Sequence, residues 1–169
     1  VEHLGEVQAL HLHQHADDRL ILNYDNDITR SFAPQAKGSV TFFSRTAKPE
    51  GGVWLDGDTV YFRGKKALER KDILLPGLHN VENYMAAMAA VEGYASLEDV
   101  RAVARTFGGV EHRIELVREL DGVKYYNDSI ASSPTRTMSG LHSFDQQVIL
   151  IAGGYDKHIS FAPLGPEIV

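Results

Sequence analysis

Polar side chains follow two apolar segments in the second half of the chain, where a ligand could be bound. The segment Val123–Tyr126 leads into Asp128, and the segment Gln147–Ala152 leads into Gly153 and Lys157. Ligands of open α/β sheets bind at the carboxyl ends of the strands. A carboxylate such as Asp128 can accept hydrogen bonds from a sugar or coordinate a metal ion, and Lys157 can neutralise an anion. These two loops are therefore the first candidates for a binding site.

Each loop also has a purely structural interpretation. Ser133 and Pro134 are typical of a helix start, where backbone N–H groups favour an anion. The residues around Asp128 could equally form a helix cap with an Asx-turn and bind no ligand. Gly153 and Gly154 allow the backbone to approach a ligand, or simply to turn among solvated charges. This loop is not a phosphate-binding P-loop, because the pattern Gly-x4-Gly-Lys-Ser/Thr does not occur in the sequence.

Three further groups of residues have side chains suited to binding. His112 and Arg113 follow a double glycine, and Arg113 could bind a phosphate through two hydrogen bonds or form an ordinary surface salt bridge. Asn80 and Asn83 stand at an expected helix start, where their amides could read a base or cap the helix. Four histidines near the start of the chain lack a carboxylate at metal-ligand spacing, so we expect no physiological metal site at His3, His11, His13 and His15.

The candidate residues require an α/β framework whose first part is rich in strands. A break at Pro76-Gly77 separates this part from the second. Because residues 147–152 are nearly all apolar, they predict a central strand that is covered on both faces and belongs to a parallel sheet. The expected strands are 19–23, 39–43, 53–55, 59–63, 114–120, 123–126 and 147–152, and the expected helices are 25–36, 80–92, 96–107 and 133–143.

The composition excludes several classes of protein. The formal net charge of -6 argues against nucleic acid as the main partner. The chain has no cysteine, which excludes disulfides, thiolate metal sites and a cysteine nucleophile and favours a cytoplasmic location. Its apolar runs are far shorter than the ~20 residues of a membrane-spanning helix, so we expect no membrane insertion. Because the sequence starts at Val1 and stops in what reads as a first helical turn, we expect a piece of a longer protein.

Four motifs occur in an order that is specific for one family. They are Leu-His-Asn-Val-Glu-Asn, Phe-Gly-Gly-Val-Glu-His-Arg, Tyr-Asn-Asp-Ser and Leu-Ile-Ala-Gly-Gly-Tyr-Asp-Lys. Together they resemble the motifs of the Mur ligase family, and in particular of its D-glutamate-adding members, over about residues 17–169. The resemblance implies that residues 1–108 form the end of a central ATPase domain, and that residues 109–169 form the first part of a Rossmann-like C-terminal ligase domain.

The resemblance also implies a reaction and the residues that serve it. In peptidoglycan synthesis, ATP with Mg²⁺ would phosphorylate the carboxylate of UDP-N-acetylmuramoyl-L-alanine, and the amine of D-glutamate would then attack the acyl phosphate. The full-length protein would be a monomer, with most of its metal ligands outside this chain. The implied ATP-binding residues are Asn80, Asn83, His112, Arg113 and Asp128, and the implied substrate-binding residues are Ser132 and Lys157.

Three departures from the family pattern bear on this interpretation. Ile130 stands where the family has a lysine, no lysine that could be carbamylated and bridge magnesium ions precedes Lys37, and the P-loop is absent. We therefore expect no turnover by these 169 residues alone. Two alternatives stay open: another amino acid ligase of the superfamily, such as a folylpolyglutamate synthase or a different Mur ligase, and a nucleotide-binding module without catalysis.

Overall fold

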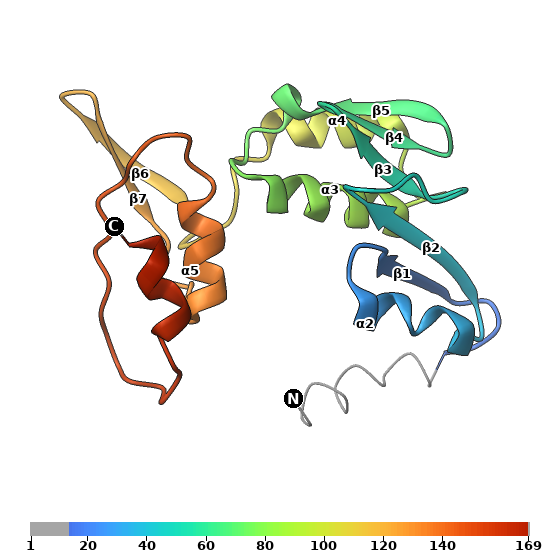
Figure 1. Cartoon of the computed structure of the whole chain (residues 1–169). Coiled ribbons are helices and arrows are strands. Elements are labelled where there is room, and N and C mark those ends of the chain that lie inside the picture. The colour runs from blue at the N-terminus through green and yellow to red at the C-terminus, as the bar shows by residue number, and fades with distance from the viewer. Residues whose placement is uncertain (1–13, 169) are drawn as a thin grey trace. The chain divides into compact units, whose positions relative to one another are not determined.

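A computed structural model describes residues 14–168, and the chain forms two compact units (Figure 1). Unit 1 comprises the residues up to Ile73 together with Val81–Thr106. Unit 2 comprises Leu74–Asn80 together with the residues from Phe107 onward. Helices and strands occur in both units, so the predicted α/β class is confirmed.

Unit 1 contains one five-stranded sheet in the order β1-β2-β3-β4-β5. Strand β2 pairs in parallel with both β1 and β3, whereas β3, β4 and β5 pair antiparallel. The turn between β3 and β4 includes Gly57 at a φ of 58°, a conformation that glycine adopts without strain. The strands are β1 Arg19–Asn23, β2 Ser39–Ser44, β3 Val53–Asp56, β4 Thr59–Phe62 and β5 Lys65–Glu69.

The core of unit 1 combines the sheet with helix α3 (Leu78–Ala90). Val53 and Val60 of the sheet and Met85 of the helix have no exposed surface, and Met88 is also buried. The helical spacing of its apolar residues predicts this helix, and the same spacing places the two methionines on its buried face. Burial of each such side chain contributes about 2 kcal/mol to folding.

Helix α4 (Leu97–Thr106) begins at the cap that the sequence predicts. The hydroxyl oxygen of Ser96 accepts a hydrogen bond from the amide of Asp99 at 3.2 Å, and the carboxylate of Asp99 accepts one from the amide of Ser96 at 2.8 Å. This reciprocal pair satisfies two amides that a helix start otherwise leaves unbonded.

The helix expected at residues 25–36 is shorter than predicted. Helix α2 covers only Asp27–Arg30, and the 3-10 turn η2 (Ala33–Gln35) follows it separately. Pro34 accounts for the early end, because in a continued α-helix its backbone nitrogen would have to donate to the carbonyl oxygen of Arg30, and proline has no N–H to donate.

Unit 2 is built from a β-hairpin and two short helical segments. Strands β6 and β7 pair antiparallel through the predicted turn at Asp121 and Gly122, whose φ angles are 51° and 79°. Helix α5 packs against the 3-10 helix η4, where Leu164 is buried (Figure 1). The bounds are β6 Glu115–Leu120, β7 Val123–Asn127, α5 Pro134–Leu141 and η4 Ala162–Glu167.

Residues 147–152 do not form the predicted central strand. They belong to an extended loop between α5 and η4, and Ile149 and Ile151 are both 94% exposed. An apolar strand is buried only where neighbouring strands pair with it and helices cover it. The described part of unit 2 offers the β6-β7 hairpin alone, so its sheet is antiparallel, and the parallel pairs within residues 14–168 lie in unit 1.

None of the helices within residues 14–168 has the length and the apolar character that crossing a membrane requires.

Candidate functional site

The carboxylate of Asp128 lies at the end of strand β7, at the centre of a group of polar contacts in unit 2. Its Oδ1 accepts a hydrogen bond from the amide of Ile114 at 3.1 Å, and its carbonyl oxygen accepts one from the amide of Ala131 at 2.9 Å. Helix α5 passes so closely that a Cβ atom added to Gly140 would lie 2.9 Å from Asp128 Oδ2. Asp128 is thus half-buried and fixed on one side of its carboxylate.

The imidazole of His112 lies beside the same strand end. His112 Nδ1 lies 2.8 Å from the amide nitrogen Nδ2 of Asn127, while Asn127 Oδ1 accepts a hydrogen bond from the amide of Ser129 at 3.1 Å. The Ser129 contact assigns the acceptor side of the Asn127 amide to the Ser129 amide, so the donor side of Asn127 faces His112 Nδ1. The carbonyl oxygen of His112 also accepts from the amide of Ile130 at 3.3 Å.

Glu115 completes this group, and it is not among the site residues that the sequence predicts. Its Oε2 accepts a hydrogen bond from the amide of His112 at 2.8 Å and lies 3.5 Å from Asn127 Nδ2. The segment that it binds is unusual, because His112 and Ile114 have positive φ angles of 66° and 45°. The spacing of His112 and Glu115, three residues apart, is the signal that could have revealed a carboxylate returning to the backbone.

The structure brings together three of the predicted site residues, His112, Arg113 and Asp128. Arg113 is exposed, and its amide donates to the carbonyl oxygen of Val110 at 3.2 Å. Ser132 lies in the turn that follows Asp128, where its amide donates to the carbonyl oxygen of Ile130 at 2.8 Å.

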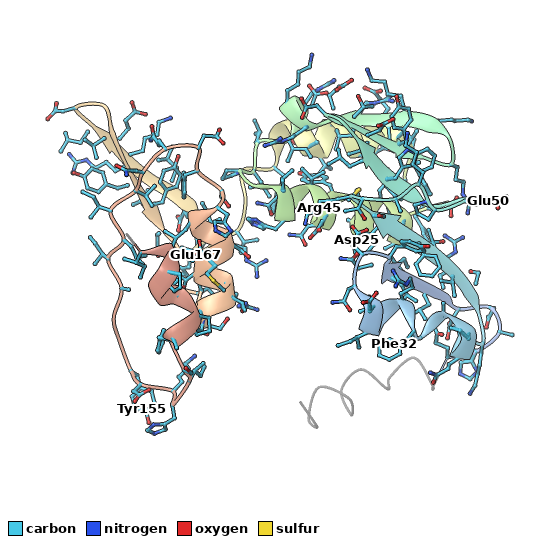
Figure 2. The ribbon with its side chains drawn as sticks, viewed as in Figure 1. Asp25, Phe32, Arg45, Glu50, Tyr155 and Glu167 are labelled. Atoms are coloured by element: carbon cyan, nitrogen blue, oxygen red, sulfur yellow. The ribbon has the colours of Figure 1, made fainter. Side chains whose placement is uncertain are left out.

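Lys157 does not join this group. It is exposed and makes no hydrogen bond or ion pair with another residue of the range 14–168. Tyr155, two residues before it, lies at the outer turn of the loop between α5 and η4 (Figure 2).

The two predicted asparagines lie on helix α3. Asn80 is buried in its first turn and donates from Nδ2 to the carbonyl oxygen of Pro76 at 2.6 Å, so part of its hydrogen-bonding capacity serves the helix start. Asn83 is exposed, in the part of α3 that belongs to unit 1.

A second polar group lies at the carboxyl ends of the parallel strands β1 and β2 in unit 1 (Figure 2). Asp25 Oδ1 accepts from the hydroxyls of Ser44 at 2.5 Å and Thr46 at 2.6 Å, and Oδ2 accepts from the amide of Arg45 at 2.7 Å. Burial opposes ionisation of this carboxyl, but the hydroxyl and amide donors outweigh it and lower the pKa of Asp25 below its ordinary value. Both carboxylate oxygens are therefore occupied by the protein itself.

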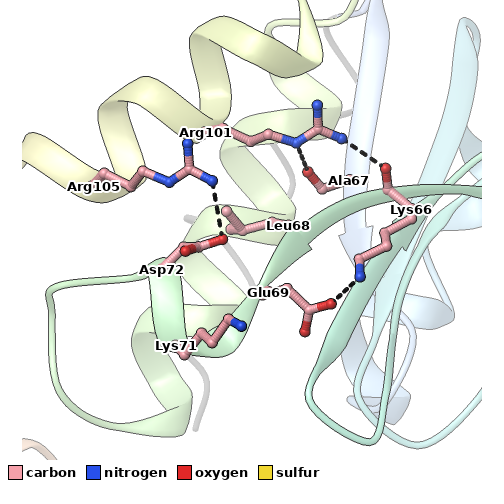
Figure 3. Close-up of a pocket in the computed structure, with 8 residues that line it drawn as sticks. All are labelled: Lys66, Ala67, Leu68, Glu69, Lys71, Asp72, Arg101 and Arg105. Atoms are coloured by element: carbon pink, nitrogen blue, oxygen red, sulfur yellow. Dashed lines mark hydrogen bonds and ion pairs between the residues drawn. The ribbon is translucent and has the colours of Figure 1, made fainter.

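A third polar group lines an open depression of about 360 Å³ between β5, the 3-10 turn η3 (Arg70–Asp72) and α4 (Figure 3). Arg101 donates to the carbonyl oxygens of Ala67 at 2.8 Å and Lys66 at 2.9 Å. Lys66 also pairs with Glu69, which raises the pKa of Lys66 and lowers that of Glu69. Arg101 thus bonds to backbone carbonyl oxygens, and Lys66 bonds to Glu69. Because these side chains are engaged within the protein, we assign the depression to the packing of α4 against β5 rather than to a ligand.

No cluster of three or more histidine, aspartate or glutamate side chains suited to a metal ion occurs within residues 14–168. Of the four histidines considered above, His3, His11 and His13 lie outside the described residues. His15 is exposed, and its amide donates to Asp18 Oδ2 at 2.8 Å.

The fold of the chain is similar to part of a solved Mur ligase. It matches the crystal structure of MurF from Acinetobacter baumannii with a TM-score of 0.64 at 20% sequence identity, over 80% of this chain and 31% of that chain. No protein-family model matches the chain.

The particular ligases that the sequence resembles are UDP-N-acetylmuramoylalanine-D-glutamate ligases. That of Acetivibrio thermocellus is 56% identical over 171 residues, which cover 99% of this chain and 37% of the relative. That of Clostridium novyi is 54% identical over 166 residues, which cover 98% of this chain and 36% of the relative. The chain thus spans little more than a third of these curated relatives, and the predicted resemblance to the Mur ligase family, as a fragment most like its D-glutamate-adding members, is confirmed.

Proposed function

We propose that the chain supplies part of the nucleotide and amino acid sites of an ATP-dependent ligase that adds D-glutamate to UDP-N-acetylmuramoyl-L-alanine in the cytoplasm. The observation that carries the proposal is the group formed by His112, Arg113 and Asp128, which lies in a segment 56% identical to such a ligase. In this assignment residues 1–108 belong to the central ATPase domain and residues 109–169 to the C-terminal domain.

The chemistry of this group fits a nucleotide. Asp128 Oδ2 is a hydrogen-bond acceptor for the hydroxyls of a ribose, since within residues 14–168 only Oδ1 of this carboxylate accepts an amide. Arg113 supplies an exposed guanidinium that can bind a phosphate through two hydrogen bonds. From the family resemblance we assign Asn80, Asn83 and His112 to the binding of ATP, and Ser132 and Lys157 to the binding of the D-glutamate carboxylates.

The reaction we propose needs positioning and charge neutralisation rather than a nucleophilic side chain. The substrate carboxylate takes the γ-phosphoryl group of ATP and ADP leaves. The amine of D-glutamate then attacks the acyl carbon, inorganic phosphate leaves, and an amide bond forms. Mg²⁺ accompanies ATP in such reactions, but we assign no metal ligand to the described residues, because they contain no suitable cluster.

A grafted ligase tests the proposal, namely the Acetivibrio thermocellus relative in which this chain replaces the matching 171 residues. We expect the grafted ligase to release ADP only when both UDP-N-acetylmuramoyl-L-alanine and D-glutamate are present. The unmodified relative is the positive control, which shows that the assay detects ADP release. Release of ADP that does not depend on D-glutamate, or that depends on a different amino acid, would contradict the assignment.

A further inference from the structure

We propose that Glu115 and Asn127 are positioning residues that keep the segment 112–114 against the end of strand β7, so that Arg113 and Asp128 are presented to the nucleotide together. The inference rests on the proposed function, because it takes the nucleotide as the ligand of this group. Neither residue is assigned a contact with substrate, and both act through the backbone and the ring of His112.

Arg113 lies between two residues whose amides are bound by carboxylates. The amide of His112 donates to Glu115 Oε2 at 2.8 Å, and the amide of Ile114 donates to Asp128 Oδ1 at 3.1 Å. The backbone of Arg113 is therefore fixed on both sides, while its side chain stays exposed. One of these two acceptors is itself a proposed nucleotide ligand, and the other, Glu115, has no such role.

The backbone angles explain why the segment needs these acceptors. His112 and Ile114 have φ angles of 66° and 45°, in the left-handed region that β-branched residues such as isoleucine rarely adopt. A conformation of this kind persists only when the surrounding contacts over-determine it. Removing the acceptor of the His112 amide should therefore release the segment and move Arg113 away from Asp128.

Asn127 couples the ring of His112 to Glu115. Its Nδ2 lies 2.8 Å from His112 Nδ1 and 3.5 Å from Glu115 Oε2, and its Oδ1 is already occupied by the amide of Ser129 at 3.1 Å. The amide can thus present only its donor side to the histidine and the carboxylate. Asn127→Asp would replace this donor with a carboxylate oxygen that faces Glu115 Oε2, and the repulsion between the two carboxylates would disturb the same segment.

Steady-state kinetics of the grafted ligase test the inference. We expect Glu115→Ala to raise the KM for ATP about 10-fold, as for loss of one charge-assisted hydrogen bond, while the KM for D-glutamate changes less than about twofold. Glu115→Gln retains an acceptor oxygen and should stay within about threefold of the parent. Glu119→Ala, at an exposed glutamate of the same strand, is the matched control. Asn127→Asp should also raise the KM for ATP, which keeps the test decisive if the alanine variant does not fold.

Two kinetic outcomes would overturn the inference. Glu115→Ala with the same KM for ATP as Glu119→Ala would show that the segment needs no acceptor. Glu115→Gln as impaired as Glu115→Ala would show that Glu115 acts by its charge on the ligand and is not a positioning residue.

Amide hydrogen exchange in the 169-residue chain separates this inference from the proposed function, because it needs neither ATP nor turnover. We expect the His112 and Ile114 amides to exchange at least about 10-fold faster in Glu115→Ala than in Glu119→Ala. Equal exchange in both variants would overturn the positioning role. A grafted ligase that fails to release ADP would instead refute the proposed function and leave the exchange result to decide the role of Glu115.

Discussion

The two units keep their strands in place by different means. In unit 1 the strands bury Val53 and Val60 completely against a helix that buries Met85. In unit 2 the hairpin leaves large apolar side chains in solvent, with Val117 61% exposed and Val123 55% exposed. The site of unit 2 is held instead by hydrogen bonds between its loops. Apolar side chains therefore form a core only where another part of the protein covers them. Elsewhere, hydrogen bonds fix the local structure.

The two strand-end aspartates show the same contrast. Asp25 in unit 1 accepts hydrogen bonds on both carboxylate oxygens from Ser44, Arg45 and Thr46. Asp128 in unit 2 accepts one amide on Oδ1. A carboxylate that the protein has already saturated stabilises the fold, whereas one with an oxygen that accepts no hydrogen bond within residues 14–168 can still accept one from a ligand. This difference favours Asp128 over Asp25 as the ligand-binding residue.

The largest effect is expected in the core of unit 1. Met85→Ala removes a side chain with no exposed surface and leaves a cavity, which should lower the free energy of unfolding by about 3 kcal/mol. Urea denaturation of the 169-residue chain followed by circular dichroism measures this loss. Val103→Ala, on the exposed face of α4, is the control and should change stability by less than about 0.5 kcal/mol. Equal losses in the two variants would contradict the packing of Met85 in the core of unit 1.

Asp25→Asn should lower the stability of unit 1 by about 1–2 kcal/mol, because one of its new N–H groups would face a hydrogen-bond donor. The pKa of the Asp25 carboxyl is lowered in the fold, so its carboxylate stabilises the folded state above the ordinary value of 3.8, and this contribution is lost as the pH falls through the lowered pKa. The difference in the free energy of unfolding between parent and variant should thus be largest at neutral pH and become smaller in acid. A difference that stays constant down to low pH would contradict the role of the carboxylate, and the exposed Asp17→Asn is the control.

Gly140→Ala should disturb the site of unit 2 with little change in overall stability. The added Cβ would lie 2.9 Å from Asp128 Oδ2, and Asp128 must rotate away and weaken its contact with the Ile114 amide, at a cost of about 1 kcal/mol. Alanine has a higher helix propensity than glycine, which stabilises helix α5 by about 1 kcal/mol and offsets this cost. Amide exchange at Ile114 should become faster, and Gly153→Ala, where an added Cβ meets nothing within 4 Å, should leave it unchanged. Unchanged exchange in Gly140→Ala would show that Asp128 has room to move.

The smallest effect is expected in the loop between α5 and η4. Ile149→Ala removes an apolar side chain that is 94% exposed, so the free energy of unfolding of the 169-residue chain should change by less than about 0.5 kcal/mol. Urea denaturation checks this value. A loss of several kcal/mol would mean that Ile149 is packed in solution and would remove the contrast between the units.

Local signals in the sequence predicted most of the elements. The Asp121-Gly122 turn, the reciprocal cap of Ser96 and Asp99 and the helical spacing around Met85 each act within a few residues, and the structure confirms all three. Strand β5 was missed, because its two buried residues, Ala67 and Leu68, are adjacent and stand between two lysines and a glutamate, so the sequence shows no alternation of buried and exposed positions.

Features that depend on distant partners could not be predicted in this way. The apolar composition of residues 147–152 indicates burial, but whether a strand forms depends on a neighbour for its backbone groups, which the sequence pattern does not specify. At the site, the motifs indicated His112, Arg113 and Asp128 but not Glu115, because the partner of Glu115 is the backbone amide of His112, three residues away, and not a recognisable side chain.

Substitution of the two candidate ligand groups in the grafted ligase tests the central claim most directly. Asp128→Ala should raise the KM for ATP at least about 10-fold and leave the KM for D-glutamate nearly unchanged, whereas Lys157→Ala should do the reverse. Glu119→Ala, at an exposed glutamate of the same hairpin, is the control. If the KM for ATP of Asp128→Ala stays within about twofold of that control, Asp128 does not bind the nucleotide and the proposed site is wrong.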